Sequence, residues 1–182
     1  AAYGGTGDLY FDDNALVIQA YCRAYALLGD PGYLEEAKAV ADFEYTFGWN
    51  ETIGGMWWNT GSRDFSATCA TAALAYASAM LYEQSGEALY LDWCKRLYDW
   101  AKENVLDSDG LYINQVNMNG SSDDSTRFKW TYNTGYFISV GSKLYTFTKD
   151  AAYLRDAKIS AAAADAYFGK EVNGAYRFDT AE

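Results

Sequence analysis

A motif that recurs about every 60 residues constrains the fold of this chain more than any other feature. The register Tyr-Leu-x-x-Ala/Cys-Lys begins at Tyr33, at Tyr90 and again at Tyr153, each time directly after a polar turn. An apolar stretch of helical length precedes each turn, at residues 14–28, 66–84 and 134–147. The chain is therefore expected to contain three copies of one supersecondary unit.

Each unit has the pattern of a helical hairpin. Leu34, Ala37 and Ala41 follow the three- and four-residue steps of one helical face, which favours a helix over a strand. Pro31 stands just past the first apolar stretch, where a proline ends a helix and helps to turn the chain. A glycine with an aromatic residue two positions later follows each second helix: Gly55 and Trp57, Gly110 and Tyr112, Gly174 and Tyr176. We therefore predict a helix, a short turn, a second helix and a longer loop in each unit.

The predicted fold class is all-α, with helical hairpin repeats that form part of an (α/α)6 toroid. Alanine-rich stretches at residues 70–79 and 161–164 let helices approach on several sides, as suits an inner helix. An open solenoid or a small bundle could use the same hairpins. Closing a toroid of six hairpins takes roughly twice this chain. We therefore expect residues 1–182 to be a single, truncated (α/α)6 catalytic domain of about three hairpins.

The composition excludes several classes of function. A net charge of −11 argues against nucleic acid as a partner, because Lys and Arg supply most of that affinity, and an uncharged glycan suits the surface better. Histidine is absent, which excludes Ser-His and Cys-His catalysis and most zinc sites. No stretch approaches the roughly 20 apolar residues of a transmembrane segment. Cys22, Cys69 and Cys94 lack metal-ligand spacing and are expected to be small buried hydrophobic residues.

Two adjacent acids, Asp12 and Asp13, stand where a loop turns into the first predicted helix. Helix capping explains such a pair without any chemistry. Retaining glycosidases, however, need two carboxyl groups about 5 to 5.5 Å apart, one as nucleophile and one as acid/base. The helix start favours an ionised carboxylate, while a second carboxyl beside the first resists ionisation and has its pKa raised. The pair is therefore the candidate catalytic pair.

Aromatic and amide side chains accompany this pair. The loop at residues 54–59 (Gly-Gly-Met-Trp-Trp-Asn) belongs to the same unit, and residues 130–135 (Trp-Thr-Tyr-Asn-Thr-Gly) begin the third unit at the same expected end of the ring. Tryptophan rings offer flat faces to sugars, and we expect one of the two adjacent tryptophans to be buried and the other to line a cleft. The predicted substrate-binding residues are Tyr10, Asn14, Trp57, Trp58, Asn59, Tyr132 and Asn133.

Two other acidic runs are expected to be ordinary turns. Asp123 and Asp124 lie in a small polar stretch with turn composition. Residues 107–110 (Asp-Ser-Asp-Gly) begin like a calcium loop but lack its later ligands, including the glutamate at the twelfth position.

Several of these strings together resemble glycoside hydrolase family 76 in type, order and approximate spacing. They are Tyr-Phe-Asp-Asp-Asn-Ala at 10–15, Gly-Gly-Met-Trp-Trp-Asn at 54–59, Tyr-Asn-Thr-Gly at 132–135 and Tyr-Leu-Arg-Asp-Ala at 153–157. The resemblance implies an (α/α)6 toroid, endo-acting hydrolysis of α-1,6-mannan with retention, and no metal. By position, Asp12 resembles the nucleophile and Asp13 the acid/base. Family members have further hairpins, and fungal relatives are regarded as transglycosidases of cell-wall glycans or glycolipid anchors.

Alternatives from other functional classes remain beside an α-mannanase. The same toroid could bind mannan or another mannose-containing glycan without hydrolysing it, or transfer glycans as a cell-wall transglycosidase does. A sugar epimerase is disfavoured, because epimerases on this toroid rely on histidines. The polysaccharide substrate predicts a secreted or cell-surface protein. We expect the half ring by itself to be weakly active or inactive.

Overall fold

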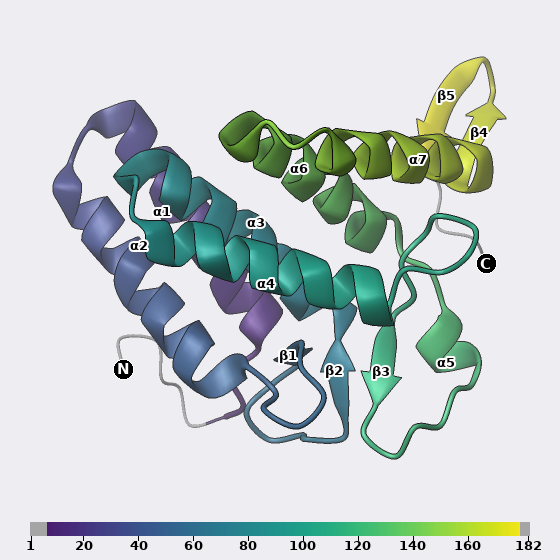
Figure 1. Cartoon of the computed structure of the whole chain (residues 1–182), viewed down its shortest axis with the longest axis horizontal. Coiled ribbons are helices and arrows are strands. Elements are labelled where there is room, and N and C mark those ends of the chain that lie inside the picture. Colours follow the sequence, from purple (N-terminus) through teal and green to yellow (C-terminus); the bar gives the residue numbers. More distant parts are fainter. Residues whose placement is uncertain (1–6, 179–182) are drawn as a thin grey trace.

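The computed structural model describes residues 7–178, in which three helical hairpins lie side by side (Figure 1). The hairpins pair α1 (Phe11–Leu28) with α2 (Pro31–Phe43), α3 (Thr68–Ser85) with α4 (Ala88–Asn104), and α6 (Thr131–Thr148) with α7 (Ala151–Phe168). The first helices of successive hairpins pack together, α1 on α3 and α3 on α6. Helices α1, α3 and α6 therefore form an inner row and α2, α4 and α7 an outer row, which confirms the predicted hairpin repeats.

The turns inside the hairpins explain where the helices end and begin. α1 ends at Gly29 and α3 at Gly86, whose φ angles of 70° and 71° suit glycine. The Asp30 carboxylate accepts a hydrogen bond of 2.9 Å from the backbone N–H of Gly32 and so caps α2. Pro31 is the first residue of α2, where its missing N–H costs nothing, rather than a residue between the helices.

The loops after the second helices contain short strands that the helical pattern did not predict. β1 (Met56–Trp57), β2 (Phe65–Ala67) and β3 (Gln115–Asn117) form an antiparallel sheet in that order, and β4 (Gly169–Val172) pairs with β5 (Ala175–Phe178). A short helix, α5 (Asp124–Arg127), lies between β3 and α6. Figure 1 shows the three-stranded sheet at one end of the first two hairpins and the β4–β5 hairpin at the far end of α7. The sheet thereby ties the loops of the first and second repeats together.

Alanine makes α3 the most enclosed helix of the inner row. Its alanines pack against α1, α4 and α6, and five of them are 0% exposed: Ala70, Ala72, Ala75, Ala77 and Ala79. Small side chains on several faces allow this close approach, as the sequence predicted. Cys22 and Cys94 are also buried, in agreement with their predicted role as small hydrophobic residues.

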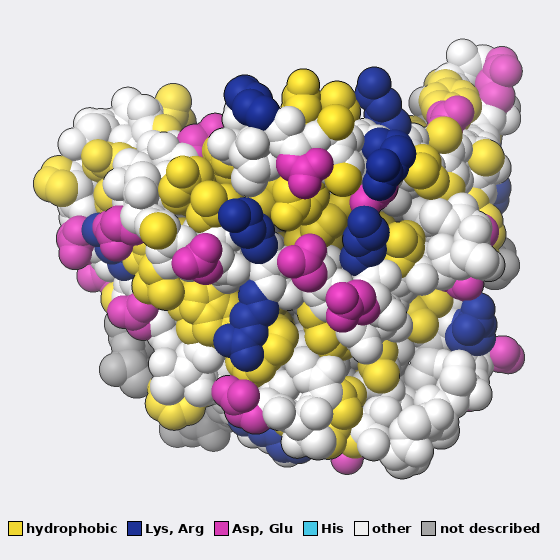
Figure 2. Space-filling model, viewed as in Figure 1, with side chains coloured by type: hydrophobic (Ala, Val, Ile, Leu, Met, Phe, Trp, Pro, Cys, Tyr) yellow, Lys and Arg dark blue, Asp and Glu magenta, His cyan; other side chains and the backbone are white. Residues whose placement is uncertain are grey.

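The outer surface mixes charges of both signs. Figure 2 shows Lys and Arg side chains interspersed with Asp and Glu, with hydrophobic side chains between them, over the face that carries α2 and α4. Lys38, for example, forms ion pairs with Glu35 and Glu87. This face therefore offers no uniform basic patch to a polyanion. Within residues 7–178, no helix combines the length and apolar character that crossing a membrane requires.

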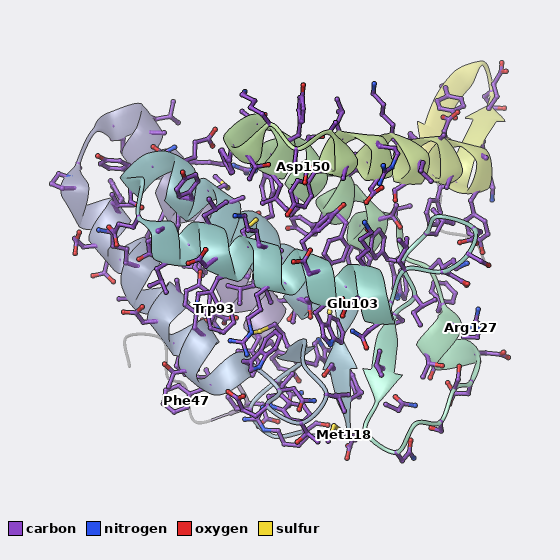
Figure 3. The ribbon with its side chains drawn as sticks, in the orientation of Figure 1. Phe47, Trp93, Glu103, Met118, Arg127 and Asp150 are labelled. Atoms are coloured by element: carbon purple, nitrogen blue, oxygen red, sulfur yellow. The ribbon has the colours of Figure 1, made fainter. Side chains whose placement is uncertain are left out.

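A π-helical turn, η1 (Glu44–Gly48), continues α2 beyond Phe43. A Cβ at Gly48 would lie 2.4 Å from the Met56 side chain and 2.9 Å from the Phe11 ring, so η1 packs tightly against β1 and the start of α1. Phe47 of this turn and Met118, which follows β3, lie along the same edge of the molecule (Figure 3). The π-turn therefore belongs to the loop end of the hairpins.

The run at residues 107–110 is a turn, as predicted, whereas the run at Asp123 and Asp124 was expected to be a turn and instead begins the short helix α5. Asp123 caps α5 in a reciprocal capping box with Thr126. Asp107 and Asp109 lie in a hydrogen-bonded turn and both form ion pairs with Lys129. Among residues 7–178, no group of three or more His, Cys, Asp or Glu side chains is placed to hold a metal ion.

Candidate active site

A cavity of about 260 Å³ opens where the three inner helices begin. Asp12 of α1, Cys69 of α3 and Tyr132 of α6 line it, and each is the second residue of its helix. Each also stands the same number of residues ahead of the Tyr-Leu pair of its own repeat. The repeat therefore brings three equivalent helix starts to one cavity. The other lining residues are Trp58, Phe65, Ala67, Asn114, Gln115 and Trp130.

A second cavity, of about 220 Å³, follows the inner helices away from the first. It shares Asp12, Cys69 and Tyr132 with the first cavity and adds Leu16, Ala73 and Tyr136. Asp12 therefore lies where the two cavities meet, which gives its carboxylate access to both.

Backbone hydrogen bonds anchor the start of α1 to the tryptophan loop. The N–H of Phe11 donates to the carbonyl of Trp58 at 2.9 Å, and the N–H of Thr60 donates to the carbonyl of Leu9 at 3.0 Å. The ring of Tyr10 meets the ring of Trp58 edge-on, with 5.1 Å between centroids. The acid pair and the tryptophan loop are therefore held in one rigid arrangement.

The glycine pair ahead of the tryptophans is required by packing against Trp100. Gly54 and Gly55 have φ angles of 72° and 74°, and a Cβ on either would lie 2.4 Å or 2.6 Å from the Trp100 ring. The Trp100 Nε1–H donates to the carbonyl of Ile53 at 2.8 Å and so fixes this contact. The loop can therefore fold back over α4 and present Trp58 at the cavity.

The Asp12 carboxyl is half-buried, and the groups around it act on its pKa in opposite directions. Burial raises its pKa, and the nearby charge of Asp13 raises it further. Side-chain hydrogen bonds with Cys69 and Trp58, and one from the backbone N–H of Asp13 at 3.2 Å, oppose that rise. Each of these groups donates to the carboxylate and therefore favours its ionised form.

The two members of the acid pair differ in exposure. Asp12 lines the cavity, whereas the side chain of Asp13, one position further along α1, is exposed. From the sequence, a raised pKa was expected for the acid/base member of the pair. The structure instead resolves a raised pKa on Asp12, because burial is its largest cause and Asp12 is the more buried carboxyl.

The aromatic residues predicted to bind substrate separate into two groups. Trp58 is 39% exposed and Tyr132 is 46% exposed, and both line the cavity. Trp57 is partly buried and packs under Arg63, whose guanidinium carbon lies 5.1 Å from the ring centroid. Tyr10 contacts the edge of Trp58. Of the two adjacent tryptophans, Trp58 is therefore the one at the cleft.

The three predicted amides lie behind the cavity wall. Asn59 is 5% exposed, and its side-chain oxygen accepts two backbone hydrogen bonds within its own turn. The Asn14 side chain donates to the Tyr10 carbonyl at 2.8 Å, and so supports the start of α1. Asn133 is fully buried, and its amide has no hydrogen-bond partner within residues 7–178. None of the three lines either of the cavities described above.

Cys69, Asn114 and Gln115 are among the cavity residues that were not predicted from the sequence. Cys69 was expected to be a buried hydrophobic residue, but it is partly exposed and hydrogen-bonds to Asp12. Aligning the repeats on their Tyr-Leu pairs would have found it, because it occupies the position of Asp12 and Tyr132. Asn114 and Gln115 could not be found in this way. They line the cavity because β3 pairs with β2, and no sequence motif predicts that pairing.

Comparison with known proteins identifies relatives of the chain. The sequence profile of Glycosyl hydrolase family 76 matches residues 2–180. The mannan endo-1,6-alpha-mannosidase DCW1 of Candida glabrata is 33% identical over 108 residues, which are 54% of this chain and 24% of that protein. The chain thus spans only a minor part of the length of the curated relatives that it matches.

Solved structures match over most of the chain. A GH76 α-mannanase of Bacteroides thetaiotaomicron has a TM-score of 0.87 and 31% identity, covering 96% of this chain and 49% of that one. An inactive variant of the α-1,6-mannanase of Salegentibacter, with two consecutive aspartates replaced by asparagine, was solved with α-1,6-mannotriose. It has a TM-score of 0.79 and 26% identity, covering 85% of this chain and 46% of that one. The hairpins therefore match part of the (α/α)6 toroid of this family.

Proposed function

Because the chain belongs to glycosyl hydrolase family 76, we propose that its site cleaves α-1,6-mannosidic linkages in α-mannan by a retaining mechanism. The observation that carries this proposal is the Asp12 carboxyl, which lines the cavity in the first turn of α1 and is followed directly by a second acid. The inactive Salegentibacter variant with two consecutive aspartates replaced supports the assignment of a consecutive pair.

In the proposed reaction, Asp12 is the nucleophile and Asp13 the acid/base. The Asp12 carboxylate attacks the anomeric carbon, and the bond from that carbon to the glycosidic oxygen breaks while Asp13 gives its proton to the departing oxygen. Water then attacks the anomeric carbon of the glycosyl ester, Asp13 takes up a proton from it, and Asp12 leaves as a carboxylate. Two inversions at one carbon give net retention.

The environment of Asp12 suits the nucleophile. Removal from water opposes its charge, but hydrogen bonds from Cys69, Trp58 and the Asp13 backbone favour the ionised state and hold it in position. Its place in the first turn of α1 adds the favourable end of the helix dipole. Attack from a fixed carboxylate requires little reorganisation at the moment of reaction.

The cavity also has the side chains that a mannose ring requires. Trp58, Trp130 and Tyr132 offer aromatic faces, and the Trp130 and Tyr132 rings stack on each other with centroids 5.9 Å apart. Asn114 and Gln115 supply amides for hydroxyl groups. We therefore propose that these residues bind the glycan.

The test replaces each acid in turn in the full-length protein, because the half ring by itself is expected to be weakly active or inactive, and measures release of reducing ends from α-1,6-mannan. Asp12→Asn and Asp13→Asn are each expected to lower the rate by at least about 1000-fold. Asp124→Asn, in the exposed acidic pair at α5, is the matched control and should hydrolyse like the wild type. Near-normal hydrolysis by both active-site variants would contradict the proposal.

A non-catalytic glycan-binding protein is the second candidate. The exposure of Asp13 favours it, because a carboxyl in water lacks the enclosure that an acid/base group usually has. Calorimetry with α-1,6-mannotriose separates the two candidates: binding without any reducing ends supports the second one.

We further propose that residues 1–182 form about half of a catalytic domain, since the chain covers 49% of the matching Bacteroides α-mannanase. Transfer of the glycosyl group from Asp12 to a second glycan, in place of water, is the alternative second step of the same proposed reaction. A mannan substrate favours a secreted or cell-surface location.

A further inference from the structure

Glu44 is a fully buried acid that the proposed reaction does not use. Its side chain is 0% exposed, and neither carboxyl oxygen has a hydrogen-bond partner within residues 7–178. Leaving a buried carboxyl unpaired is costly, and the cost is far greater for the charged form than for the neutral acid. An acid in this position therefore calls for an explanation beyond packing.

The other two repeats show that the fold does not require an acid here. Counted from the Tyr-Leu pair of each repeat, the residues equivalent to Glu44 are Ala101 and Ala164, and both are buried. α4 and α7 remain α-helical at these positions, whereas the first repeat widens into the π-turn η1 at Glu44. Single π-turns within helices are frequent at functional sites. Glu44 and its π-turn are thus a local departure from the repeat.

This departure lies directly behind the first turn of α1. The turn packs against α1, where the Phe43 and Phe11 rings stack with centroids 5.9 Å apart. Phe47, in the same π-turn, is 57% exposed at the edge of the molecule (Figure 3), while Glu44 is turned inward. Phe11 immediately precedes Asp12, so the π-turn and the acid pair share one contact region.

The groups around Glu44 leave Asp12 as its charged neighbour. Burial raises the pKa of Glu44 well above its ordinary value, and the negative charge of Asp12 raises it further. Tyr45, on the same turn, is a neutral phenol that hydrogen-bonds to Ser78 of α3 at 2.8 Å. Cys69 of α3 lies on the cavity side of Asp12 and bonds to it. The buried Glu44 carboxyl and the half-buried Asp12 carboxyl therefore disfavour each other's negative charge.

We propose that Glu44 is a positioning residue for the reaction, an uncharged acid packed behind the first turn of α1 that leaves Asp12 as the charged carboxyl of this region. This inference rests on the proposed function for its catalytic meaning. While Glu44 keeps its proton, Asp12 carries the charge that the nucleophile needs. When Glu44 ionises at higher pH, a second negative charge appears behind the acid pair and opposes both folding and the placement of Asp12.

The first test follows stability against pH and needs no activity. Glu44→Gln keeps the shape without the ionisation, Glu44→Ala restores the residue of the other repeats, and Glu51→Gln, exposed in the next loop, is the control. The pKa of Glu44 is raised in the folded state. The free energy of unfolding of the wild type should therefore fall as the pH rises from the ordinary pKa of a glutamate toward the raised pKa of Glu44. That fall amounts to about tenfold in the folding constant per pH unit. Both Glu44 variants should lose this component, and the control should keep it.

A double-mutant cycle tests the pairing with Asp12. In an Asp12→Asn background the charge that disfavours ionisation of Glu44 is gone, so the pH window attributable to Glu44 should move to lower pH. Identical windows with and without Asp12, or identical pH dependence of wild type and Glu44→Gln, would overturn the proposal.

The last arm measures kcat/KM on α-1,6-mannotetraose across pH. The alkaline loss of activity should begin at least one pH unit higher in Glu44→Gln than in the wild type, because the second charge no longer forms. If Glu44 only fills space, the pH at which activity is lost on the alkaline side should be the same in Glu44→Gln and in the wild type. That result would overturn the positioning role. A stability window that depends on Asp12, in a full-length protein that hydrolyses no mannan, would support the coupling of Glu44 to Asp12 and contradict the proposed function.

Discussion

The thiol of Cys69 should tune the charge of Asp12, and Cys69→Ala tests this directly. Hydrogen bonds to charged groups contribute about 1.5 to 3 kcal/mol, and a thiol is a weak donor, so the lower end applies. About 1.4 kcal/mol corresponds to one pKa unit. Burial already raises the pKa of Asp12, and losing a donor to the carboxylate should raise it by about one further unit. Cys69→Ser keeps a donor and should hold the pKa at or below the wild-type value.

The assay is a carbon-13 NMR titration of the Asp12 carboxyl in the three proteins, with Cys22→Ala, a buried cysteine of α1, as the control. The acid limb of kcat/KM should move the same way, because less Asp12 is ionised at a given acidic pH in Cys69→Ala. Stability should follow the sign of a raised carboxyl pKa: it falls as pH rises from the ordinary aspartate value to the folded-state value. The fall should extend further in Cys69→Ala. Equal titration midpoints in wild type, Cys69→Ala and Cys69→Ser would refute the reasoning.

Two further predictions concern the tryptophan loop. Gly55→Ala should destabilise the chain by about 2 to 4 kcal/mol in denaturant unfolding, because the new Cβ meets the Trp100 ring. Gly120 has a similar φ of 71° but open space around it, so Gly120→Ala should lower the free energy of unfolding by only about 1 kcal/mol. Trp58→Ala should weaken α-1,6-mannotriose binding at least about tenfold in calorimetry, while Trp57→Ala should mainly lower stability, and equal losses of affinity would contradict the assignment of Trp58 to the cleft.

Much of the fold could be predicted because its signals are local and repeated. The Tyr-Leu register and the apolar stretches located all three hairpins. The helix starts differ from the expected ones by two or three residues, and at α3 the difference arises because residues 65–67 pair as β2. The strands themselves could not be predicted, since β1 to β3 are only two or three residues long. Their pairing joins residues that are far apart in sequence, which leaves no periodic pattern.

The site was predictable where chemistry and repeat position coincide, and less so where only residue type was considered. Asp12, Trp58 and Tyr132 meet at the cavity, as their places in the repeat indicated. Asn59 and Asn14 have side chains well suited to sugars, yet both are spent on backbone hydrogen bonds. An amide near a turn satisfies the backbone as readily as a ligand, and sequence alone does not separate the two uses.

The geometry of the repeat explains why a site forms at this end of the hairpins. The first helix of every hairpin begins at the same end, so the cavity collects the N-terminal turns of α1, α3 and α6, represented by Asp12, Cys69 and Tyr132. The positive ends of the helix dipoles gather where these turns meet, and they favour a negative charge. The desolvation that raises the pKa of Asp12 is thereby partly offset by the architecture itself. An isolated hairpin would supply only one such turn, and a carboxylate enclosed to the same degree there would hold its charge less well.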